Sequence, residues 1–325
     1  MKGVKFIGCI LLCAVAGTAI AEDSVEPQVW LERMSEALRT LNFDGTFVYM
    51  HDGQMHAMRI IQSADEQGKA ERLVSLTGHP REVIRDADLV TCILPDSKSV
   101  VVETSRSNRG FPMILPTRLD ELERHYTFAA HGEDRVAGRV ARKFAIQPRD
   151  GYRYGYELWL DVENHLLLKA NLVNEQGEAV EQFMFTELQV LDQVPAALMQ
   201  PSVSGKEYAW HRQKETKADS RPERSPWQVS ALPEGFSLEV HRKNYLSTSM
   251  MPVEHMVFTD GLSSVSVFIE EQSLDQEPIV GRSRMGAVNA YSRVVAEHQV
   301  TVVGEVPAAT VRMIGESIAP TPDAE

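Results

Sequence analysis

The residues of this chain that could do chemistry do not form a recognisable catalytic set. The sequence has no G-x-S-x-G, H-E-x-x-H, Walker or G-x-G-x-x-G motif. His51 and His56 flank a predicted hairpin; a metal pair fits that spacing, but we favour exposed polar residues beside a turn. We predict no catalytic residues, no metal, no cofactor and no enzymatic activity. An unrecognised hydrolase is the remaining alternative.

Basic residues that lie close together in the sequence could recognise anions. Arginine side chains bind phosphate and carboxylate groups through two parallel hydrogen bonds, so this group could hold an anionic headgroup or an acidic partner segment. The alternative, which we favour, is a solvated strand face. The group consists of Arg135, Arg139, Arg142, Lys143, Arg149 and Arg153. Arg282 and Arg284, in a predicted loop bounded by glycines, are further candidates for contact with a partner.

Large apolar side chains at alternating positions could line a lipid site. A chain of about twelve methylenes would gain roughly 10 kcal/mol on burial, so such a site needs apolar surface and no sharp motif. The alternative is a filled core that is covered by two predicted helices, residues 27–41 and 118–126. The candidate lining residues are Phe47, Tyr49, Tyr154, Tyr156, Leu158 and Phe185, with Ile114 and Leu115 as a mobile lid.

The elements that position these residues follow from periodicity. Apolar residues at helical spacing predict the helix at 27–41, and Thr117 caps the short helix at 118–126. Alternating patterns separated by short turns predict strands of an antiparallel sheet. These strands are residues 43–50, 55–62, 71–76, 81–86, 89–94, 98–103, 127–131, 139–147, 153–161, 165–173 and 179–190.

A second, smaller unit follows a change in composition. Residues 204–226 are rich in Ser, Pro, Lys and Arg and are predicted to be a linker. Beyond them lie predicted strands and a terminal helix, at 236–243, 253–259, 264–271, 289–296, 299–304 and 307–317. The predicted organisation is a signal peptide (1–21), a large domain (22–203), a linker (204–226), a smaller domain (227–318) and a disordered tail (319–325).

The first residues have the pattern of a secretory signal. Lys2 and Lys5 precede an apolar run at 6–16, and a small-x-small site ends at Ala21. The apolar run is too short for a membrane span, which takes about 20 residues. We therefore expect cleavage after Ala21 and export of the chain.

Charge and cysteine content limit the partners of the exported chain. Without Lys2 and Lys5, the 33 basic residues fall to 31 against 46 acidic residues, a net charge of −15. Such a charge argues against nucleic acid as a partner. Cys92 is then the one remaining cysteine and lies in an apolar run, so a buried, inert thiol is expected rather than an intermolecular bridge.

Six segments, in order along the chain, carry a family resemblance. They are Phe43–Tyr49, Pro148–Asp150, Arg153–Leu158, Leu232–Phe236, Val265–Glu270 and Thr301–Pro307. Together they resemble the RseB/MucB family of periplasmic negative regulators of envelope-stress sigma factors of the sigma-E/AlgU type. The resemblance covers nearly the whole chain after the signal peptide. It implies export across the inner membrane to the periplasm, which agrees with the signal-peptide pattern.

The resemblance implies an α+β fold. The large N-terminal domain (22–203) would be a lipid-sensing, curved antiparallel sheet, a LolA/LolB-like unclosed barrel with helices in its opening. The smaller C-terminal α/β domain (227–318) would bind the partner. The family binds the periplasmic segment of a membrane-spanning anti-sigma factor (RseA/MucA-like) and protects it from site-one proteolysis. Lipid or lipopolysaccharide releases that grip, and the protein forms a homodimer or larger assembly. The alternative function is a periplasmic carrier of lipid or lipoprotein.

Overall fold

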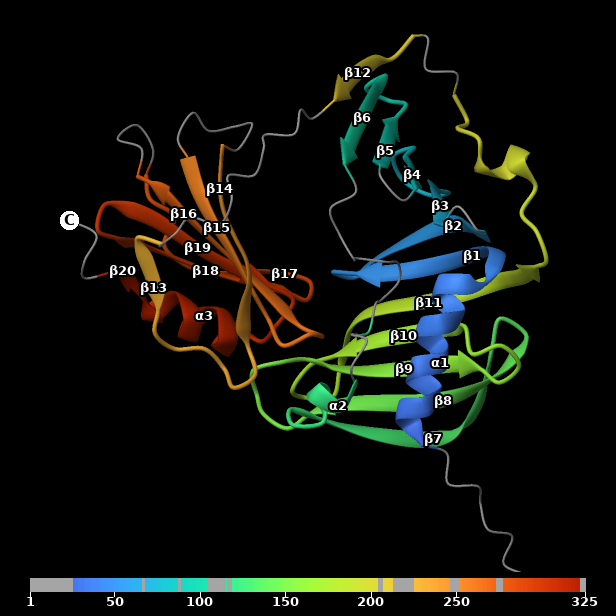
Figure 1. Cartoon of the computed structure of the whole chain (residues 1–325), viewed down its shortest axis with the longest axis horizontal. Helices are drawn as coiled ribbons and strands as arrows, with labels where there is room; N and C mark the ends of the chain where they lie inside the picture. Colours follow the sequence, from blue (N-terminus) through green and yellow to red (C-terminus); the bar gives the residue numbers. More distant parts are fainter. Residues whose placement is uncertain are drawn as a thin grey trace, which may run out of the picture.

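The computed structural model describes residues 26–65, 68–86, 89–104, 115, 119–203, 207–212, 225–245, 252–272 and 277–321. The predicted signal peptide, its cleavage site and Ile114 lie outside these residues. The described chain folds into two sheet-based units (Figure 1).

The N-terminal unit is one large sheet with two free edges. Within the described residues, its twelve strands follow the order β12-β6-β5-β4-β3-β2-β1-β11-β10-β9-β8-β7. Neighbours are antiparallel except β12 and β6, which are parallel. The strands are β1 (Asn42–His51), β2 (Gln54–Asp65), β3 (Gly68–Ser75), β4 (Glu82–Arg85), β5 (Leu89–Leu94), β6 (Ser99–Thr104), β7 (Tyr126–Val136), β8 (Arg139–Pro148), β9 (Gly155–Asp161), β10 (Leu167–Val173), β11 (Ala179–Leu191) and β12 (Ala209–Arg212).

Helix α1 (Pro27–Thr40) covers part of the apolar face of this sheet (Figure 1). Pro27 suits the first helical turn because proline lacks the N–H that would go unpaired there. The helix buries Leu31, Met34 and Leu38 against the sheet. In β1 the buried positions alternate from Phe43 onward, as expected of a strand with one covered face.

The C-terminal unit is a six-stranded antiparallel sheet in the order β14-β15-β16-β19-β18-β17. Helix α3 (Ala308–Ser317) packs Val311 and Ile314 into its core. A short strand pair, β13 with β20, completes the unit. The strands are β13 (Trp227–Val229), β14 (Ser237–Tyr245), β15 (Pro252–Thr259), β16 (Ser264–Glu271), β17 (Gly281–Met285), β18 (Val288–Val295), β19 (His298–Gly304) and β20 (Ile318–Pro320).

The predicted fold class, a large unclosed sheet with helices at its opening and a smaller second domain, is confirmed. Three local predictions were wrong. The predicted linker contains β12, and the predicted tail begins within β20. The short helix α2 (Leu119–Leu122) ends before residue 126, and residues 123–125 form a turn. In addition, a 3-10 helix that the sequence patterns did not indicate, η1 (Ala196–Met199), follows β11.

Arg282 and Arg284 lie on strand β17, where the sequence predicts a loop. Every residue of β17 is exposed, so the strand has no alternation of apolar and polar positions by which it could be recognised. Its pairing with β18 depends on backbone hydrogen bonds. Because every residue type except proline can form these bonds, they are hard to predict from the sequence.

Candidate functional site

Three of the predicted lipid-lining residues lie in the centre of the N-terminal core. Phe47, Leu158 and Phe185 are at most 3% exposed. The rings of Phe47 and Phe185 meet edge to face, with centroids 6.0 Å apart. Leu115, the described half of the predicted lid, is 4% exposed in the same core. In this conformation the apolar face is filled by the chain itself, so a lipid would have to displace side chains to reach it.

Three predicted tyrosines lie at the end of the sheet that faces the C-terminal unit. Tyr49 donates a hydrogen bond to Glu181 at 2.7 Å, and Tyr154 accepts one from Asn289 of β18 at 3.0 Å. Burial, followed by the hydrogen bond and charge of Glu181, raises the pKa of Tyr49 well above its usual value. Burial also raises the pKa of Tyr156, and the carboxylate of Glu305 adds to that rise. These tyrosines form part of the domain interface.

The basic cluster is used mainly within the protein. Arg139 pairs with Asp161 at 2.7 Å, Arg142 with Glu133 at 2.9 Å, and Lys143 with Glu157 at 2.6 Å. Burial alone would raise the pKa of Glu157, but hydrogen bonds from Lys143 and Asn171 outweigh it and lower that pKa. The favoured interpretation of a strand face therefore fits these three, while Arg153 has a different role.

Arg153 joins the two domains. Its guanidinium group, fully buried, lies 3.0 Å from the fully buried carboxylate of Asp260 on the C-terminal unit. It also donates to the backbone carbonyl of Glu234 and stacks 5.1 Å from the ring centroid of Phe236. Tyr126 of β7 donates to the same Asp260 carboxylate at 2.8 Å. We call the Arg153–Asp260 contact the interdomain ion pair.

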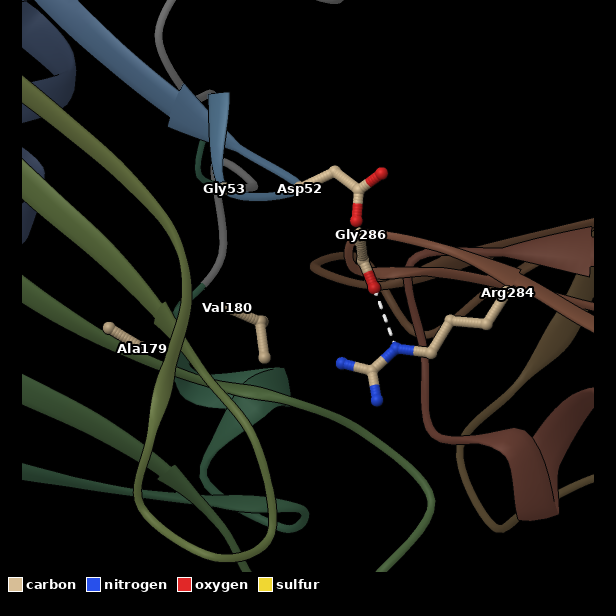
Figure 2. Close-up of a pocket in the computed structure, with 6 residues that line it drawn as sticks. All are labelled: Asp52, Gly53, Ala179, Val180, Arg284 and Gly286. Carbon is tan, nitrogen blue, oxygen red and sulfur yellow. Dashed lines mark hydrogen bonds between the residues drawn. The ribbon is translucent and has the colours of Figure 1, made fainter. Parts of the chain in front are cut away.

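A cavity of about 360 Å³ opens beside this interface (Figure 2). The turn between β1 and β2, the start of β11 and the turn between β17 and β18 surround it. Arg284 extends into it, and its Nε donates to the carbonyl of Gly286 at 2.8 Å. The cavity is lined by Asp52, Gly53, Ala179, Val180, Arg284 and Gly286.

The structure brings one of the two partner-binding candidates, Arg284, into this interdomain cavity, while Arg282 lies exposed on the same strand. Neither arginine forms an ion pair with any residue that the structure describes. Guanidinium groups that have no carboxylate partner within the described residues suit recognition of carboxylates. Sequence patterns missed Asp260 as a partner of Arg153, because Asp260 was visible only as a turn residue.

Among the described residues, no three His, Cys, Asp or Glu side chains gather in a way that could hold a metal ion. None of the described helices is long and apolar enough to cross a membrane.

Comparison with known proteins covers both units. The MucB/RseB N-terminal domain model matches residues 26–203, and the MucB/RseB C-terminal domain model matches residues 221–319. The sigma factor AlgU regulatory protein MucB of Pseudomonas aeruginosa is 33% identical over 95% of this chain and 94% of its own length. The sigma-E factor regulatory protein RseB of Haemophilus influenzae is 26% identical over 97% of this chain and 98% of its own.

A solved structure of MucB in complex with MucA(peri) is similar in three dimensions. It is 30% identical, the match covers 91% of this chain and 99% of that chain, and the TM-score is 0.70. The family models together span almost all of the residues described, and the relatives match along their full length. The predicted resemblance is thus confirmed, and the chain belongs to the MucB/RseB family.

Proposed function

We propose that this protein is a periplasmic negative regulator that binds the periplasmic segment of a membrane-spanning anti-sigma factor and protects it from site-one proteolysis. The observation that carries the proposal is the similarity, across both domains, to a MucB chain solved in complex with MucA(peri). The named relatives are regulatory proteins of sigma factors. The signal-peptide pattern at residues 1–21 supports export to the periplasm.

The domain interface supports binding through a surface that includes both domains. The interdomain ion pair, together with a hydrogen bond of 2.6 Å from Thr310 to the carbonyl of Tyr152, holds the C-terminal unit against the large sheet. A preorganised surface loses less entropy on binding than one assembled from independent parts. The guanidinium group of Arg284 at the cavity and that of Arg282 on the same strand suit an acidic segment. The net charge of −15 on the exported chain would repel such a segment elsewhere on the surface.

Release by lipid or lipopolysaccharide is the second part of the proposal. An acyl chain would enter the N-terminal core among Phe47, Leu158 and Phe185 by displacing α1 or Leu115. For lipid to weaken the grip on a peptide, it must prefer the conformation that binds peptide less well. We further propose a homodimer or larger assembly, as the family resemblance implies.

The test uses the purified chain starting at Glu22, the residue after the expected cleavage site, and the periplasmic segment of the anti-sigma factor from the same organism. We expect saturable binding, slower cleavage of the segment by the site-one protease, and loss of both effects when acylated lipid is added. A short-chain analogue with the same headgroup is the control for charge alone. Absence of binding would overturn the regulatory function; unchanged affinity in saturating lipid would overturn the release mechanism only.

A further inference from the structure

Strand β17 forms one edge of the C-terminal sheet. It is the last strand in its sheet order, and no other described strand pairs with its outer side. Apolar residues just before the strand and at its end are strongly exposed: Ile279 is 71%, Val280 is 66% and Met285, the last residue of β17, is 61% exposed. A sheet edge with unpaired backbone groups and exposed apolar side chains is a template for an additional strand.

The edge is held in place before anything binds to it. The buried side chain of Gln299 accepts a hydrogen bond from the N–H of Ile279 at 3.0 Å and donates to its carbonyl at 2.8 Å. At the other end, Gly286 has a φ of 59°, which suits the first position of a two-residue hairpin turn. Both ends of the edge are thus anchored to the sheet. The strand therefore loses little conformational entropy when a partner binds.

The hairpin register sets which backbone groups point outward. Met285 pairs with Val288 next to the two-residue turn, and Arg284 and Arg282 pair with Asn289 and Tyr291. Hydrogen-bonded and non-hydrogen-bonded pairs alternate along an antiparallel ladder. With the pair beside the turn hydrogen-bonded, Arg282 and Arg284 direct their own N–H and C=O groups toward the open side.

The positive charges of β17 indicate which kind of segment can pair with this edge. Arg282 and Arg284 lie two residues apart and therefore on one face of β17, the face from which Arg284 reaches the interdomain cavity (Figure 2). A second copy of β17, paired antiparallel about Ser283, would set arginine against arginine, and like charges directly opposite are destabilising. A segment with carboxylates at alternate positions would instead place each acid opposite one arginine.

We propose that β17 binds an extended acidic segment of the partner as an added edge strand. Two carboxylates, two positions apart, meet Arg282 and Arg284, and apolar residues of the segment cover Ile279 and Val280. The side chains on the arginine face enter the interdomain cavity. This inference rests on the proposed function, because it names the place and chemistry through which the anti-sigma segment is held.

Charge reversal tests the side-chain contacts. The probe is a set of overlapping fluorescent peptides that cover the periplasmic segment of the anti-sigma factor, with binding measured by anisotropy. R282E/R284E should weaken the best peptide by about tenfold or more, as expected when two cross-strand attractions become repulsions. The control R33E/R81E makes the same change in net charge on exposed residues of the N-terminal unit and should change affinity less than about threefold.

Two further measurements separate a direct contact from an indirect one. A peptide whose acids are replaced by lysine should regain affinity for R282E/R284E and lose it for the wild type. R282P removes an outward N–H, which an edge strand tolerates, and should bind more weakly than R282A if backbone pairing occurs. Retention of wild-type affinity by both R282E/R284E and R282P would overturn the edge assignment while leaving the regulatory function intact.

Two other outcomes of these measurements would also overturn the edge assignment. Failure of every peptide to bind the wild-type chain would overturn the proposed function, and the edge assignment with it. If R282E/R284E changed the oligomeric state in analytical ultracentrifugation and left peptide affinity unaltered, the edge would belong to a second copy of the chain.

Discussion

Replacement of Asp260 by asparagine should destabilise the protein through the interdomain ion pair. Asparagine keeps an oxygen that can accept from the N–H groups of Leu262 and Ser263, which the Asp260 Oδ1 accepts at 2.9 and 2.7 Å. It removes the negative charge that faces Arg153 and replaces Oδ2, which accepts from Tyr126, with an NH2 donor. The fully buried guanidinium group then loses its buried counter-charge while remaining out of water.

The expected magnitude follows from what is left around the arginine. Removal of one partner of a buried ion pair costs about 3–5 kcal/mol, because the other charge remains buried. Asp150 also lies 3.3 Å from Arg153, but its side chain is 29% exposed and therefore only partly compensates. We expect Asp260→Asn to lower the free energy of unfolding by about 3 kcal/mol, near the lower end of that range.

Urea unfolding followed by tryptophan fluorescence measures this effect. Asp150→Asn is the matched control and should cost about 1 kcal/mol or less, since its carboxylate is solvated. Combining Asp260→Asn with Arg153→Met should give a smaller loss than the sum of the single variants, because no unpaired cation stays buried. Equal losses for Asp260→Asn and Asp150→Asn would refute the central role given to the interdomain ion pair.

Three further predictions concern single residues. Gly45→Ala should lower stability by about 1–3 kcal/mol, because a Cβ would lie 2.6 Å from the ring of Phe185, whereas Gly132→Ala meets nothing within 4 Å and should be nearly neutral in thermal unfolding. Burial, assisted by Asp260, raises the pKa of Tyr126 far above 10. The unfolded chain therefore loses this proton first, stability falls above about pH 10, and Tyr126→Phe should show a shallower fall in urea unfolding at alkaline pH. Burial raises the pKa of Cys92, so maleimide should label it more slowly in the native chain than in urea; equal rates would contradict this.

The parts of the fold that local patterns predict are those with one buried face. The helix predicted at 27–41 is observed as Pro27–Thr40, because each apolar residue at helical spacing has sheet beneath it. The strand predicted at 43–50 is Asn42–His51 for the same reason. Periodicity records which residues are covered, so it identifies elements that have a covered side.

Two of the edge strands, β12 and β17, escaped prediction because none of their described residues is buried. All residues of β12 and β17 are exposed, and each strand is held by backbone pairing to a neighbour chosen by the tertiary fold. The interdomain ion pair was also not predicted from the sequence, for a related reason. Arg153 was visible as one cation of a basic cluster, but its buried partner Asp260 lies in another domain and had only a turn signal. Pairing between segments far apart in the sequence produces no periodic pattern in either segment.

Because the N-terminal core is filled, a lipid that enters it must gain enough binding free energy to displace α1. Lifting α1 would expose Leu31, Met34 and Leu38, at about 1.5–3 kcal/mol for each large apolar side chain. A single acyl chain of about twelve methylenes gains roughly 10 kcal/mol gross, and association itself costs about 4 kcal/mol or more. These terms nearly cancel, which favours ligands with several acyl chains over a lone fatty acid.

We propose that a route from such a ligand to the proposed partner surface would pass through Tyr156. Its ring packs against the N-terminal core and also against the cluster that Tyr154 and Leu172 form with Ala287 of the C-terminal unit. Ala287 belongs to the turn that joins β17 to β18. Displacement of Tyr156 by a ligand in the core would therefore disturb the β17 edge directly. A coupling of about 1–3 kcal/mol through this contact suffices to change partner affinity roughly 5- to 150-fold.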